Sequence, residues 1–289
     1  MRKIIIDAGI GLPEEFIKKY EIEIVPVNIF SEEGEDFSEK NIEEIIDSIK
    51  KGKILKPSGI SSERLIKVYR KYKDKNIISI HVGSTISGVT DIAKIVAKKM
   101  KEENTHVYII DTLTAGPAAG IGIFKNIDKL LNEKIPPAEI EKEIQEISKK
   151  TEMFFILKNP KMLLRVRPVE GLKRVLKNPL VILKYIKSGG GYPLLSLKLG
   201  LFKTLKFVPK KKDEVEEIIN FIMENYLKKK DRIIAFTFGC KREKDEERMI
   251  KILKENFEGE IYSTPPIPLW VACIGTGFIG IAFYKENEG

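Results

Sequence analysis

Short apolar runs and amphipathic helical patterns alternate along the first half of the chain. The clearest unit is a strand over residues 77–82, a polar loop over residues 83–88 and a helix over residues 89–101. Strands that alternate with helices at this spacing predict a largely parallel, layered sheet. The same patterns predict further strands at residues 3–7, 21–30 and 106–111, and helices at residues 13–20, 41–50, 61–72, 115–131 and 136–150.

The second half of the chain has a different rhythm. Two apolar runs, at residues 193–198 and 201–208, flank Gly200 and predict a β-hairpin. Residues 162–186 have a helical period that prolines interrupt, and the glycines at 189–191 predict a hinge or turn. The remaining predicted elements are strands at residues 153–157, 232–238, 260–263 and 279–284, and helices at residues 213–227 and 249–256. This order predicts a mixed sheet with helices.

The length of the chain supports two domains. It has 289 residues, 43% of them hydrophobic, which is long for one core and sufficient for two. We place the boundary after the helix that ends near Lys150. The predicted fold class is therefore α/β, with an N-terminal α/β domain at residues 1–150 built on a mainly parallel sheet and a C-terminal α/β domain at residues 151–289 built on a mixed sheet.

Charge and cysteine content narrow the function classes. The formal net charge is +9, but Lys and Glu alternate along the chain, which is typical of solvated helix faces. The basic run at residues 210–212 lacks interleaved aromatics, so nucleic-acid binding is disfavoured. Cys240 and Cys273 have no partners at metal-ligand spacing, which predicts neither a metal nor a disulfide scaffold. With no signal peptide and no apolar run long enough for an integral membrane segment, we expect a cytoplasmic protein without cofactors.

Hydroxyl side chains gather in the loop between the clearest strand and its helix. Ser84, Thr85 and Ser87 lie between Gly83 and Gly88, where open α/β sheets bind ligands and where free backbone N–H groups favour an anion. A second cluster precedes another helix and consists of Ser58, Ser61 and Ser62. Such residues also cap helices, so capping and ligand binding both stay open here. The loop has neither P-loop nor nucleophile-elbow spacing, which disfavours phosphate transfer and serine hydrolysis.

Other candidates for chemistry are few. The two histidines, His81 and His106, lie in or beside predicted buried strands, which favours hydrogen-bonded core positions over general bases. Asp7 and Asp111 end predicted strands and could act as a base or cap a loop. Cys273 is most simply a small buried hydrophobe. The glycines of residues 116–122 have the wrong order for a dinucleotide fingerprint and indicate a closely packed helix.

Four separated segments resemble the DegV family. They are DAGIGLP at residues 7–13, PSGISS at residues 57–62, ISIHVGSTISG at residues 78–88 and GTGFIGIAF at residues 275–283. Together they span essentially the whole chain. Two departures stand out, because Pro57 replaces a family Thr and Cys273 takes the place of a His that many relatives have.

The resemblance implies a non-enzymatic lipid-binding protein that holds one long-chain fatty acid in a tunnel between its two domains. It also implies that the acid is presented to a separate fatty acid kinase subunit. By position, Ser84 and, approximately, Ser58 would bind the carboxylate. The other residues expected near the carboxylate are Thr85, Ser61, Ser87, Lys211 and Cys273, and those expected to support the loops are Asp7, Gly83 and Gly88.

Two alternatives remain from the residues themselves. One is an α/β enzyme that acts on a small anionic substrate with Asp7 or Asp111 as its base. The other is a basic protein that binds nucleic acid or a membrane surface, whose affinity would fall steeply with salt. We expect the lipid-binding function rather than either of these.

Overall fold

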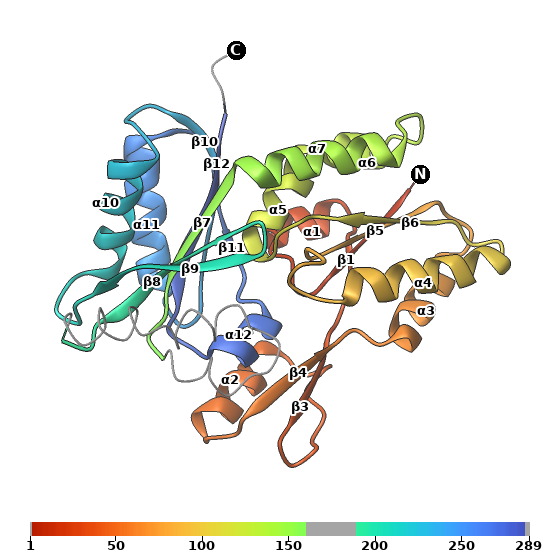
Figure 1. Ribbon diagram of the computed structural model, residues 1–289, viewed down its shortest axis with the longest axis horizontal. Helices are drawn as coiled ribbons and strands as arrows, with labels where there is room; N and C mark the ends of the chain where they lie inside the picture. The colour runs from red at the N-terminus through yellow and green to blue at the C-terminus, as the bar shows by residue number, and fades with distance from the viewer. Residues whose placement is uncertain (1, 160–188, 287–289) are drawn as a thin grey trace.

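The computed structural model describes residues 2–159 and 189–286 and contains two main sheets (Figure 1). The predicted segment at residues 162–186 lies outside the described residues. The first sheet has the strand order β2-β1-β5-β6, and all of its pairings are parallel. Its strands are β1 (Lys3–Asp7), β2 (Glu23–Val25), β5 (Ile77–His81) and β6 (Val107–Asp111). The predicted parallel sheet is confirmed.

Helices cover both faces of this sheet, which explains why β1 and β5 are buried along their whole length. On one face, α4 (Val89–Glu102) packs against β5 and β6, and α3 (Ser62–Lys71) packs beside it. On the other face lie α5 (Gly116–Lys125), α6 (Ile127–Leu131) and α7 (Pro137–Lys150). A short helix, α1 (Glu14–Lys19), connects β1 to β2.

The prediction of one strand over residues 21–30 is wrong. Pro26 has no N–H for a sheet ladder, and the chain leaves the first sheet there. It continues as β3 (Asn28–Ser31), which pairs antiparallel with β4 (Leu55–Gly59) in a separate two-stranded ribbon. The helix α2 (Ile42–Lys50) joins the two strands, with Asn41 and Glu44 forming a capping box at its start.

The predicted helix over residues 115–131 is two helices. The chain breaks at Asn126, whose backbone leaves helical geometry and whose side-chain amide donates to the Gly122 carbonyl at 3.0 Å. The first of the two, α5, is almost entirely buried, and its glycines allow close packing. A Cβ at Gly120 would lie 1.8 Å from the Gly11 carbonyl oxygen. This confirms the closely packed helix that the sequence indicated.

The second sheet has six strands in the order β11-β10-β12-β7-β8-β9. Only β10 and β11 pair in parallel, so the predicted mixed sheet is confirmed, as is the hairpin of β8 and β9. The strands are β7 (Thr151–Ile156), β8 (Tyr192–Lys198), β9 (Leu201–Val208), β10 (Arg232–Gly239), β11 (Glu258–Thr264) and β12 (Ile279–Lys285).

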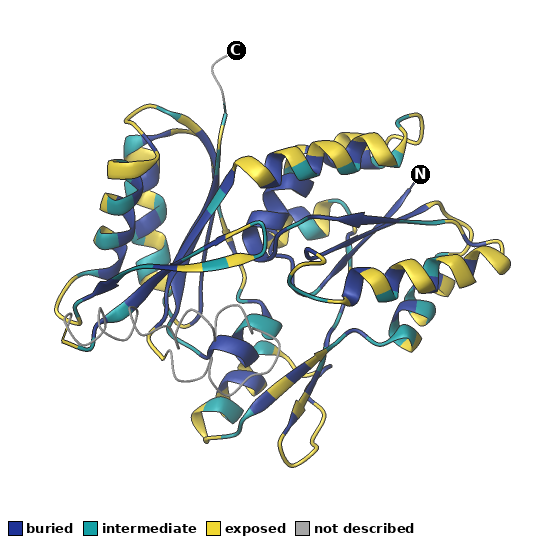
Figure 2. Ribbon diagram, in the orientation of Figure 1, coloured by how far each residue is buried: buried dark blue, intermediate teal, exposed yellow. Residues whose placement is uncertain are grey.

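Helices from both halves of the chain cover the second sheet. One face carries α10 (Glu214–Asn225) and α11 (Glu243–Asn256), and the other face packs against α5. The central strands of both sheets and the inner helix faces are buried, while the outer helix faces and parts of the edge strands β9 and β11 are exposed (Figure 2). Since α5 belongs to the first half but packs on the second sheet, the two halves share one core. The domain boundary at residue 150 stays a prediction.

One short helix was not predicted. It is α12 (Pro268–Ile274), which follows β11 and contacts α2 and β4 of the first half. Its sequence, PLWVACI, has no polar face and therefore no helical period. This helix brings the C-terminal half to the edge of the parallel sheet.

Candidate functional site

A cavity of about 430 Å³ opens beside the carboxyl ends of β1 and β5. The first half contributes the ends of these strands, the loop before α4 and part of the ribbon strand β4. The second half contributes one residue each from β7 and β9, together with α12. The site therefore lies between the two halves of the chain, at the edge of a parallel sheet where ligands commonly bind.

The wall of the cavity is largely apolar. Phe155 and Trp270 meet with ring centroids 5.8 Å apart, and Phe202 packs edge-on against Phe155 at 6.4 Å. Aliphatic side chains complete this wall, among them Val27, Ile60, Ile86, Leu269 and Ile274. Such a surface suits a hydrocarbon chain better than a polar metabolite.

Polar groups in the wall are few. They are the carboxylate of Asp7, the hydroxyls of Ser58 and Ser87, and the thiol of Cys273. Burial raises the pKa of the Cys273 thiol to about 12, so this group is neutral at physiological pH. Among the described residues that line the cavity there is no Lys, Arg or His. Asp7 is thus the single formal charge in the described wall.

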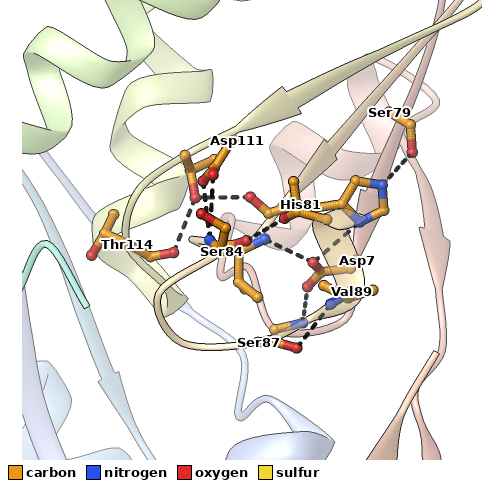
Figure 3. A network of polar contacts seen from close by, with 12 residues as sticks. Asp7, Ser79, His81, Ser84, Ser87, Val89, Asp111 and Thr114 are labelled. Atoms are coloured by element: carbon orange, nitrogen blue, oxygen red, sulfur yellow. Dashed lines mark hydrogen bonds and ion pairs between the residues drawn. The ribbon is translucent and has the colours of Figure 1, made fainter. Parts of the chain in front are cut away.

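Asp7 holds two loops together through hydrogen bonds (Figure 3). It is only 1% exposed; its Oδ1 accepts a hydrogen bond from the Gly9 N–H at 2.7 Å and its Oδ2 accepts one from the Val82 N–H at 2.8 Å. The first bond is local to the turn after β1, and the second ties that turn to the end of β5. The loop-supporting role that the sequence suggested for Asp7 matches this geometry.

A series of buried polar side chains in contact with one another lies behind Asp7. His81 Nδ1 lies 3.4 Å from Asp7 Oδ2, and His81 Nε2 lies 2.9 Å from Ser79 Oγ (Figure 3). The Tyr69 hydroxyl donates to Ser79 Oγ at 2.9 Å, and burial raises the pKa of Tyr69. His81 is fully buried, so the prediction of a core histidine is confirmed for it. It is wrong for His106, which is exposed just before β6.

Asp111 shapes the loop over residues 83–88 from the other side. Its carboxylate accepts the Leu113 N–H at 2.9 Å and, over longer distances of 3.3 and 3.4 Å, the Ser84 N–H (Figure 3). Gly83 donates its N–H to the Thr114 carbonyl at 2.7 Å, and a Cβ there would lie 2.6 Å from the Leu113 carbonyl carbon. Glycine is therefore required at position 83.

The predicted site residues divide into two groups. Those in the cavity wall are Asp7, Ser58, Ser87, Gly88 and Cys273. Those outside the wall are Ser61, Gly83, Ser84, Thr85 and Lys211. Which of them contact a bound head group stays a prediction.

Local contacts explain why several of the predicted site residues lie outside the cavity wall. Ser84 and Thr85 are exposed, and Thr85 Oγ1 would lie 2.2 Å from a Cβ at Gly200, so Thr85 faces the turn of the β8–β9 hairpin. Ser61 is the N-cap of α3 and accepts the Arg64 N–H at 3.3 Å, as the capping alternative expected. Lys211 is exposed in the loop between β9 and α10.

The sequence argument missed the aromatic part of the site. Phe155, Phe202 and Trp270 come from three separate elements, so no local motif unites them. One signal was available, because Trp270 is the sole tryptophan of the chain and lies close to the GTGFIGIAF segment. A half-buried tryptophan combines a large apolar surface with an N–H donor, which is why the residue is enriched at interfaces.

Within residues 2–159 and 189–286, no group of His, Cys, Asp and Glu side chains could hold a metal ion. In the same part of the chain, no helix has the length and apolar character needed to cross a bilayer.

Comparison with known proteins identifies the family. The model of the DegV family, described as an uncharacterised protein family, matches residues 1–286. A DegV domain-containing protein of Clostridium perfringens is 31% identical over 149 residues, which is 50% of this chain and 52% of that protein. A protein of Thermotoga maritima named fatty acid-binding protein is 31% identical over 124 residues, covering 40% of this chain and 42% of that protein. In these alignments the chain spans about half or less of each relative.

Solved structures agree over the full length. The crystal structure of a DegV lipid-binding protein from Thermotoga maritima superposes with a TM-score of 0.81 at 22% identity and covers 100% of this chain and 99% of that one. Such a likeness shows a common fold, with the same arrangement of a parallel and a mixed sheet. From the match over residues 1–286, the chain belongs to the DegV family.

Proposed function

We propose that this protein binds a long-chain fatty acid in the cavity between its two halves and is not an enzyme. The observation that carries the proposal is the wall itself, which combines an aromatic and aliphatic surface with hydroxyls at the loop edge. In this arrangement the acyl chain lies against Phe155, Phe202 and Trp270, and the head group lies beside Ser58 and Ser87.

The energetics favour such a ligand. Removing an acyl chain from water stabilises the complex by about 0.8 kcal/mol per methylene group. The cost of burying a polar head group is offset only if it finds hydrogen-bond partners. Ser58 and Ser87 are partly open to solvent and carry hydroxyls that can donate to a carboxylate oxygen.

The comparisons support the same ligand class. The Thermotoga maritima relative at 31% identity is named a fatty acid-binding protein, and the structural neighbour is named a lipid-binding protein. The enzyme alternative has less support, because Asp7 and Asp111 both accept backbone N–H groups in loops. Presentation of the acid to a kinase subunit and a cytoplasmic location stay predictions from the sequence.

Mass spectrometry tests the proposal directly. Denaturing the purified protein and extracting it with organic solvent should release fatty acid in near-equal molar amount. Titrating delipidated protein with palmitate should change the fluorescence of Trp270, which is the sole tryptophan and lies in the cavity wall. A protein that carries no lipid and shows no response to palmitate would overturn the proposal.

Two adjacent residues provide a matched pair of variants. Phe202 lies in the cavity wall, while its neighbour Leu201 is 74% exposed and lies outside it. Phe202→Ala should weaken palmitate binding by about tenfold or more, since an aromatic contact with the acyl chain is lost. Leu201→Ala should leave the affinity unchanged. Equal effects of the two substitutions would argue against this cavity as the binding site.

A further inference from the structure

A second cavity, of about 510 Å³, lies at the opposite end of the parallel sheet. Its residues come from the amino-terminal ends of three strands, with Arg2 before β1, Asn76 before β5 and His106 before β6. The last turns of α4 and Pro137 at the start of α7 complete the wall. In Figure 1 this is the end of β1 beside the label N, away from α12. None of these residues belongs to the acyl-chain site.

Two buried polar side chains in this wall have atoms without a hydrogen-bond partner among the described residues. Arg2 is 7% exposed, and its Nη2 donates to the Ile135 carbonyl at 2.6 Å and the Glu133 carbonyl at 3.3 Å, but its buried Nη1 has no hydrogen-bond partner. Thr105 is 1% exposed, and its Oγ1 also has none. Buried polar groups without partners are rare and destabilising, so these two atoms, both in residues of the cavity wall, lack a partner that a ligand could supply.

The charges around these atoms are predominantly positive. Lys98 and Lys101 lie one turn apart on α4, both exposed at the cavity, and His106 is exposed beside them. No Asp or Glu is among the described residues of the wall. Two carboxylates lie next to the wall. Glu133 interacts electrostatically with Arg2 and lies 3.4 Å from the Asn76 amide, and Glu141 accepts from the Tyr108 hydroxyl at 2.8 Å.

We propose that this second cavity binds a phosphate ester with an apolar or aromatic body. A guanidinium, two ammonium groups and a hydroxyl match the charge and the acceptor oxygens of a phosphate dianion better than those of a single carboxylate. Ile77, Val107 and Tyr108 give the rest of the wall an apolar surface for the body of the ligand. The burial that lowers the pKa of Arg2 would be offset by the bound anion.

Calorimetric titration of the full-length protein tests this site with four probes, namely AMP, adenosine, inorganic phosphate and benzoate. AMP should bind, phosphate should compete with it, and adenosine should bind far more weakly because it lacks the anion. Binding of benzoate in preference to AMP would overturn the assignment to phosphate esters, as would the absence of AMP binding at millimolar concentration.

Two double variants separate a built site from general attraction to a basic protein. Lys98→Ala/Lys101→Ala should weaken AMP binding by about tenfold, equivalent to about 1.4 kcal/mol. Lys94→Ala/Lys99→Ala removes the same charge from exposed positions of the same helix outside the wall and should change the affinity less than about twofold. Equal losses in both double variants would contradict a specific site.

Thr105→Val provides an independent readout. The substitution keeps the volume of the side chain and removes the unpartnered hydroxyl, so the midpoint of thermal unfolding should stay the same or rise. AMP affinity should nevertheless fall, because the ligand loses a hydrogen bond. Unchanged AMP affinity in a stably folded Thr105→Val protein would exclude Thr105 from the site. A palmitate titration of the same variants should be unaffected, which keeps this test separate from that of the acyl-chain site.

Discussion

At the scale of single residues, two serines that look alike in the sequence lie in different places. Each accepts a backbone hydrogen bond of 3.3 Å, Ser61 from the Arg64 N–H and Ser87 from the Val89 N–H. Ser61 is the N-cap of α3, whereas Ser87 lies in the cavity wall. We therefore expect Ser61→Ala to lower the free energy of unfolding by about 1 kcal/mol without affecting palmitate binding. Ser87→Ala should do the reverse, with weaker binding and nearly unchanged stability. Urea unfolding and Trp270 fluorescence titration measure the two quantities.

Asp7 places a negative charge where a fatty acid carboxylate is expected. With no cation among the described wall residues, the ionised acid is repelled by Asp7 more than a neutral lipid is. The charged group that faces this region is Asp7 of β1; His81 of β5 lies behind it, and the Cys273 thiol of α12 is neutral. Palmitate should thus bind more weakly than an uncharged lipid with the same hydrocarbon chain when both are titrated at one pH.

A fatty alcohol of the same length is the comparison, since it has no charge to repel. Asp7→Asn should bring the palmitate affinity closer to that of the alcohol. If Asp7→Asn left the difference between the two affinities unchanged, charge repulsion by Asp7 would play no part in head-group selection.

At the scale of elements, most of the regular structure could be predicted from periodicity. The strands of the parallel sheet are continuous apolar runs. The strands and helices that the sequence predicted for the second half follow one another along the chain in the predicted order. The ribbon strand β4 was missed because its sequence, LKPSG, contains Pro57 and Gly59, which ordinarily mark turns. The helix α12 was missed because it is buried without a polar face, so burial rather than periodicity determines it.

The sequence predicted a site at the edge of the parallel sheet from the hydroxyls after a strand, and the cavity lies at that edge. That this cavity is the binding site stays a prediction. The spacing could not show that Thr85 turns toward the hairpin while Ser87 turns toward the cavity. That choice depends on the hydrogen bonds that the Ser84 and Leu113 N–H groups donate to the Asp111 carboxylate, and on the approach of Gly200 to Thr85. These contacts join segments far apart in the chain.

The helix α5 offers a graded test of close packing. A Cβ at Gly120 would meet the Gly11 carbonyl oxygen at 1.8 Å, so Gly120→Ala must displace backbone and should cost about 3 kcal/mol. At Gly122 the nearest atom is a methyl group of Ile144 at 3.1 Å, which can move. Gly122→Ala should therefore be near neutral, because the gain in helix propensity offsets the contact. Equal destabilisation by the two changes, measured by thermal unfolding, would contradict this account.

At the scale of the whole molecule, one apolar cluster extends through both halves and includes both cysteines. Burial raises the pKa of Cys240 to about 11 and of Cys273 to about 12. Because the unfolded thiols lose their protons near pH 9 while the folded ones keep them, the stability is fully present below that pH. Each thiol then lowers the free energy of unfolding by up to about 1.4 kcal/mol per pH unit until its folded pKa is reached.

We therefore predict that the alkaline loss of stability is less steep in a Cys240→Ala/Cys273→Ala protein than in the wild type. Urea unfolding between about pH 9 and about pH 11 measures the two slopes, and the corresponding slopes near neutral pH should coincide. Identical slopes in the alkaline range would mean that other groups, such as the buried tyrosines, control the transition.

The position of α5 also bears on how the chain is made. This helix emerges from the ribosome early, but the partners of its outer surface, β7, β10 and β12, are synthesised later. Until those strands arrive, the nascent N-terminal half exposes an apolar helix that it cannot bury by itself. Completion of its fold must therefore wait for the C-terminal half, and a fragment ending at residue 150 should aggregate or recruit chaperones.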